Sequence, residues 1–137
     1  MINRKRHYFR IFLHVFVPIL CGTTIYALWR GLHFFDQTEK KFPLLTAKHI
    51  PNWIKFNLPD GLWFYAFLSA LLFIWIENVS GHFGLWLVIV TILSFFSEVL
   101  QLYNILPGTF DWQDLLAYSL AILFFFFNFK HTKNIYL

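Results

Sequence analysis

Five of the seven acidic residues in this 137-residue chain lie in or beside long apolar segments, and four of the five are expected at the same end of those segments. A carboxylate at such a position binds a cation, relays protons or hydrogen-bonds a neighbouring helix, because an unpaired charge next to lipid is costly. Together with one glutamine, these four carboxylates form the candidate binding site: Asp60, Glu98, Gln101, Asp111 and Asp114.

A polar stripe leads to this site along the third apolar segment. Its residues are spaced three, four and three apart, in the order Thr91, Ser94, Glu98 and Gln101. That spacing places them on one face of a helix, and their neighbours are Leu, Ile, Val and Phe. We therefore expect the stripe to face the interior of a bundle, with Thr91 and Ser94 supporting the site or serving close helix packing.

Helix capping is an alternative role for the acidic residues. Asp60 follows a proline and fits the first turn of a helix, and Asp111 with Asp114 fits a cap followed by an acid in the first turn. Glu98 alternatively makes a structural hydrogen bond to a neighbouring helix. The sequence leaves these alternatives open.

The composition indicates that membrane spans must position these residues. The chain is 58% hydrophobic and 13% charged, whereas soluble domains are roughly 45–50% apolar and about 25% charged. So few charges cannot cover a water-facing surface, and a 23% aromatic content excludes a disordered chain. The net charge of +4 indicates orientation and contact with membrane lipid rather than nucleic acid.

No cofactor is predicted. The single cysteine excludes an intramolecular disulfide, and the sequence has no zinc-ligand spacing, phosphate loop or nucleophile elbow. A metal held by the carboxylates is left open.

Four apolar segments predict an all-α fold, a four-helix transmembrane bundle that forms one domain over residues 1–137. The predicted spans are residues 11–29, 61–76, 83–102 and 112–129. The first has no small-residue cleavage site after it, so we expect a retained span rather than a removed signal. The four-residue run Phe124–Phe127 is expected to face lipid.

A long connection joins the first two spans, over residues 30–60. It mixes lysines with aromatic residues, which is typical of the membrane interface. Its prolines limit any helix there to a short one.

The charge distribution predicts that both termini lie in the cytoplasm. Four basic residues precede the first span and two follow the last. Arg30 and the loop lysines oppose this orientation, because they would lie outside. In this topology the candidate site is at the outer end of the bundle, where Arg30 is a candidate counter-charge.

Two stretches carry a resemblance to a known family. Leu58-Pro59-Asp60 opens the second span, and Ser97–Ala121 reads SEVLQLYNILPGTFDWQDLLAYSLA. Over roughly residues 58–125 the chain resembles the VanZ-like family of small bacterial membrane proteins. That family shows Pro-Asp at the start of one span, Glu-x-x-Gln at the end of the next, and an Asp-rich turn into a last span. The matching residues are Asp60, Glu98, Gln101, Asp111 and Asp114.

The departures from the family pattern concern cationic residues. The basic residue or histidine usual after Pro-Asp is replaced by Gly61-Leu62-Trp63, and the usual Arg before the turn by Pro107-Gly108-Thr109. The Asn expected in the last span is Tyr118. The resemblance implies an envelope protein of the bacterial cytoplasmic membrane. The family is named for an accessory protein of glycopeptide resistance, linked to low-level teicoplanin resistance, and has no settled biochemical activity.

Four functions compete. The first is an accessory protein whose acids bind a lipid headgroup, a cell-wall precursor, a drug amine or a partner's basic patch. The second is a small homo-oligomeric transporter that moves ions or protons along the polar stripe. The third is a structural subunit bound to a partner membrane protein. An enzyme acting on a lipid-linked substrate through a carboxylate-bound metal is disfavoured, because no nucleophile accompanies the acids.

Overall fold

The computed structural model describes the backbone of residues 4–30, 50–75 and 81–136, and the side chains of residues 7–29, 50–75 and 82–130. In this part of the chain, four helical segments are long and apolar enough to cross a membrane. They are His7–Trp29, Leu58–Trp75, His82–Leu102 and Trp112–Lys130. The predicted all-α four-helix bundle is confirmed, and the protein is a multi-pass membrane protein.

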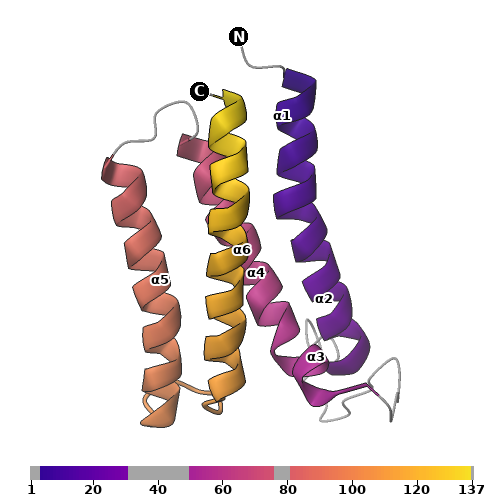
Figure 1. Ribbon diagram of the computed structural model, residues 1–137. Coiled ribbons are helices and arrows are strands. Elements are labelled where there is room, and N and C mark those ends of the chain that lie inside the picture. The colour runs from indigo at the N-terminus through magenta and orange to yellow at the C-terminus, as the bar shows by residue number, and fades with distance from the viewer. Residues whose placement is uncertain (1–3, 31–49, 76–80, 137) are drawn as a thin grey trace.

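Seven helical elements make up the described chain (Figure 1). Their order is α1 (Arg4–Ile11), η1 (Phe12–Phe16), α2 (Val17–Arg30), α3 (Asn52–Phe56), α4 (Leu58–Trp75), α5 (Gly81–Leu102) and α6 (Trp112–Tyr136). The start of α1 and the end of α6 lie at the same end of the bundle. The end of α2, the start of α4, the end of α5 and the start of α6 lie at the opposite end.

The first span is continuous but changes helix type in its middle. η1 is a π-helical turn, in which the N–H of Val17 donates to the carbonyl of Phe12, five residues earlier. Pro18 follows directly. Proline lacks an N–H, and its ring clashes with the carbonyl four residues before it. The wider π-helical turn gives that carbonyl room, as at other π-bulges.

α4 is the helix on which the others are assembled. It packs against α2 and α6 most extensively, and against α5 to a lesser degree. Gly61 lets α4 and α6 approach closely, because a methyl group there would lie 3.1 Å from the Cβ atom of Ala117. Ala66 and Ser69 are also buried along α4. Small residues permit this close helix packing without a hydrophobic driving force between helices.

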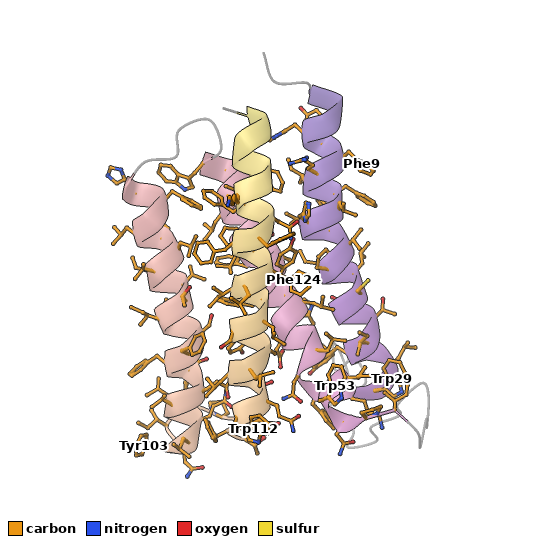
Figure 2. All side chains as sticks on the ribbon, viewed as in Figure 1. Phe9, Trp29, Trp53, Tyr103, Trp112 and Phe124 are labelled. Atoms are coloured by element: carbon orange, nitrogen blue, oxygen red, sulfur yellow. The ribbon has the colours of Figure 1, made fainter. Side chains whose placement is uncertain are left out.

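The apolar core lies between α4, α5 and α6. Its buried members are Phe64, Leu68, Leu72, Phe83, Ala121 and Phe125. Large apolar side chains also cover the outside of the bundle, including Phe9 and Phe124 (Figure 2). Within Phe124–Phe127 three side chains face outward as expected, but Phe125 is 1% exposed. The expectation of a lipid-facing run is therefore wrong at Phe125.

Aromatic side chains gather at the end of the bundle where α6 begins. Figure 2 shows Trp29, Trp53, Tyr103 and Trp112 there, on α2, α3, the α5–α6 connection and α6. Such belts are typical of the membrane–water interface. The short helix α3 agrees with the prediction for the long connection, of which residues 31–49 lie outside the described part.

Candidate functional site

The five predicted binding residues line one cavity. The start of α4, the last turns of α5 and the first turns of α6 enclose a volume of about 560 Å³, which we call the acidic cavity. None of its described lining residues is basic. They are Phe56, Asn57, Asp60, Ser97, Glu98, Gln101, Pro107, Gly108, Thr109, Asp111, Asp114 and Tyr118.

Asp111 caps α6 and also belongs to the cavity. One of its carboxylate oxygens, Oδ1, accepts a hydrogen bond of 2.9 Å from the backbone N–H of Gln113. This bond satisfies one of the free amides at the helix N-terminus. Asp111 therefore caps α6, as the alternative role predicted, and it also lines the acidic cavity.

Asn57 connects the start of α4 to the start of α6. Its side-chain nitrogen Nδ2 donates to Asp111 Oδ2 at 3.0 Å and to Asp114 Oδ1 at 2.7 Å. The residue is only 4% exposed. Hydrogen bonds to carboxylates are roughly twice as strong as neutral ones. The two bonds from Asn57 therefore hold the carboxylates of Asp111 and Asp114 side by side. Asp114 also lies in the first turn of α6, where the helix dipole stabilises an acid.

Glu98 is a buried carboxylate on the last turns of α5. The hydroxyl of Tyr118 and the backbone of Asp111 lie near its carboxylate. Its Oε2 atom is buried and has no hydrogen-bond partner among the described residues, and the residue is 3% exposed. A buried carboxylate oxygen without a partner is costly. Because Glu98 lines the acidic cavity, a donor in the cavity would satisfy it.

Gln101 lies where α5 ends and the chain turns back. Asn104 adopts a left-handed conformation (φ 57°), and the N–H of Ile105 donates to the carbonyl of Leu100. This is a Schellman cap. Gly108, with φ 139°, then passes so close that a methyl group on it would lie 2.7 Å from Gln101 Oε1. A residue with a side chain at position 108 would therefore displace Gln101.

Thr91 and Ser94, which were also predicted to support the site, lie apart from the cavity. Thr91 donates to the carbonyl of Leu87 at 2.8 Å, and Ser94 to that of Val90 at 3.0 Å. Both bonds stay within α5, and neither residue lines the cavity. Arg30 is the last residue of α2, and its side chain lies outside the described part.

The carboxylates are not arranged as a metal site. No group of three or more His, Cys, Asp or Glu side chains within the described ranges is placed to hold a metal ion. The geometry suits a larger cation with several hydrogen-bond donors. A primary ammonium group is such a cation, since it has three donors and no acceptor.

An apolar groove lies on the other side of the α4–α6 contact. α2 and α6 both pack on α4, and between them is an opening of about 680 Å³. Its lining is almost wholly apolar. The residues are Pro18, Trp53, Asn57, Leu58, Gly61, Leu62, Tyr65, Trp112, Gln113, Leu116, Ala117, Leu120, Ala121, Phe124 and Asn128. Asn57 lines both the groove and the acidic cavity.

A second polar group marks the far end of the groove. His14 Nδ1 lies 2.7 Å from the hydroxyl of Tyr65, and Asn128 Nδ2 donates to the same hydroxyl at 3.3 Å. These contacts join η1, α4 and α6 within the membrane. Among the described residues they satisfy one another, so the group has a structural role.

Asn57, Tyr118 and the groove were not expected from the sequence. A lone asparagine in a loop has no diagnostic spacing, and its partners lie 54 and 57 residues away. The available signal was its position directly before Leu58-Pro59, where a helix-capping residue is expected. No protein-family model, curated protein or solved structure matches the chain.

Proposed function

We propose that this chain is a VanZ-like accessory protein of the bacterial cytoplasmic membrane, with both termini in the cytoplasm and the acidic cavity at the outer face. The cavity binds the ammonium group of a ligand. The observation that carries this proposal is the buried Oε2 atom of Glu98, which has no partner among the described residues and lines a cavity with three further carboxylates.

Charge supports a cationic ligand. Four carboxylates border the cavity and none of its described lining residues is basic. An ammonium group donates to several of them at once, which offsets their mutual repulsion. A volume of about 560 Å³ also accepts a headgroup larger than an ion.

The hydrogen bonds made by the polar stripe favour binding over transport. A transporter needs polar groups that continue from the cavity into the membrane. Thr91 and Ser94 instead donate to carbonyls of their own helix. Oligomeric transport and a structural role in a larger complex remain the alternatives, which flux and co-purification assays test.

The test measures the binding of ethanolammonium to the full chain in detergent micelles by saturation-transfer NMR. Glu98→Gln keeps the shape of the side chain and removes its charge. We expect the affinity to fall about tenfold to a hundredfold, because a hydrogen bond to a charged group contributes about 1.5–3 kcal/mol. Ser94→Ala, one turn away on the same helix, is the matched control and should bind as the wild type does.

Two results would contradict the proposal. One is equal binding of ethanolammonium by the wild type and Glu98→Gln. The other is equal binding of ethylene glycol, which resembles ethanolammonium in size but has no charge.

A further inference from the structure

The acidic cavity and the apolar groove share one lining residue, Asn57. Asn57 donates from its Nδ2 atom to Asp111 and Asp114, which line the cavity, and Asn57 is also a lining residue of the groove. Trp53 and Phe56, on α3, line the groove and the cavity respectively. A ligand that lies over α3 and Asn57 therefore reaches both openings.

We infer that the occupant is one membrane lipid of the phosphatidylethanolamine type, with its ammonium group in the acidic cavity and an acyl chain in the groove. This inference rests on the proposed function, because it names the ligand of the same cavity. The phosphate stays at the water interface, outside the four carboxylates.

The groove has the length and lining that an acyl chain needs. The residues of α6 that border it run from Trp112 to Asn128, about 24 Å along the helix. One leaflet of the hydrocarbon core is about 15 Å deep. An acyl chain that enters beside Trp112 therefore lies within the groove, along Leu116 and Leu120, before it reaches the polar group at Tyr65 and Asn128.

Charge selects the headgroup. Acyl chains are alike among membrane lipids, and lipid tails are as apolar as leucine, so the groove alone gives little discrimination. An anionic headgroup would place negative charge next to Asp60, Glu98 and the other carboxylates. An ammonium headgroup is attracted to them. Because the headgroup and the acyl chain belong to one molecule, binding of either one makes binding of the other an intramolecular step.

The test uses native mass spectrometry of the full chain, exchanged into an equimolar mixture of phosphatidylethanolamine and phosphatidylglycerol with identical acyl chains. Leu120→Trp fills the groove. Leu123→Trp is the matched control, because Leu123 is an exposed leucine on the same helix that does not line the groove. Leu116→Trp is a second groove variant, and circular dichroism checks the helicity of each protein.

We expect the wild type and Leu123→Trp to retain phosphatidylethanolamine preferentially. Both groove variants should lose about tenfold in its retention, equivalent to about 1.4 kcal/mol. Glu98→Gln should show a smaller preference for phosphatidylethanolamine over phosphatidylglycerol than the wild type, because three carboxylates remain.

Equal retention of phosphatidylethanolamine by folded Leu120→Trp, Leu116→Trp and Leu123→Trp would overturn the inference. So would equal retention of the two lipids by the wild type. If soluble ethanolammonium still binds in a Glu98-dependent manner in either case, the proposed function stands without this ligand. If the wild type binds no ethanolammonium, the proposed function itself fails.

Discussion

Replacement of Asn57 by alanine tests the contact that holds α4 to α6 at the acidic cavity. The change removes two hydrogen bonds, of 3.0 Å to Asp111 and 2.7 Å to Asp114. A hydrogen bond to a charged group contributes about 1.5–3 kcal/mol in proteins, whereas side-chain bonds between membrane helices average about 0.6 kcal/mol. Asp111 keeps the amide of Gln113, and both carboxylates border the cavity, so they regain part of the loss from solvent.

We therefore expect Asn57→Ala to lower the free energy of unfolding by about 2–3 kcal/mol. The measurement is reversible unfolding in mixed micelles with a rising fraction of sodium dodecyl sulfate. Circular dichroism monitors the loss of helix. Asn52→Ala is the control, since Asn52 is exposed on the short helix α3, which ends directly before Asn57. An effect of Asn57→Ala as small as that of the control, within about 0.5 kcal/mol of the wild type, would refute the reasoning.

Two further predictions use the same unfolding assay. Leu68, at 0% exposure, lies in the core, so Leu68→Ala should cost about 2–3 kcal/mol, while Leu123→Ala on the outer surface should cost less than about 0.5 kcal/mol. Equal effects would mean that the core between α4, α5 and α6 is wrongly placed. Gly61→Val should cost about 1–3 kcal/mol, because its Cβ atom would lie 3.1 Å from that of Ala117 and push α4 from α6. Gly84→Val, where nothing lies within 4 Å, is its control, and similar losses at both glycines would contradict the close approach.

The spans were predictable because length and hydropathy suffice to identify them. Their ends were less so. The second span begins at Leu58 rather than at residue 61, because Pro59 fits the first turn of a helix and Asp60 is stabilised there. α6 continues to Tyr136, since the polar residues after Lys130 do not stop a helix even though they lie beyond the apolar segment.

The interior and the exterior of the bundle could not be separated by hydrophobicity. Both the core and the lipid favour apolar side chains, so the run Phe124–Phe127 has one composition and two environments. Successive residues on a helix point about 100° apart, and only the position of α4 decides that Phe125 faces inward. In a soluble protein, polar residues would have marked the outer face.

The candidate site was partly predictable for a different reason. Asp60, Glu98, Gln101, Asp111 and Asp114 are polar exceptions in or beside apolar segments, and antiparallel spans bring such exceptions to one end. Asn57 and Tyr118 required the tertiary structure, because neither residue type is exceptional where it occurs. Thr91 and Ser94 share the helix face of Glu98, but a hydroxyl on a helix also bonds the carbonyl of the preceding turn.

The neighbours of Glu98 also bear on how the chain enters the membrane. They include Tyr118 and Asp111, which are synthesised after α5, so Glu98 reaches the insertion machinery before these neighbours exist. An acid at the centre of a span costs roughly 2.5–3.5 kcal/mol on insertion scales, and less toward the end where Glu98 lies. α5 has the highest mean hydropathy of the four spans, which offsets this cost, whereas α6 is the least hydropathic and packs most extensively on α4. The third span, α5, is thus able to insert before α6 is present. When α6 then inserts, its packing on α4 holds it in the bundle and completes the cavity.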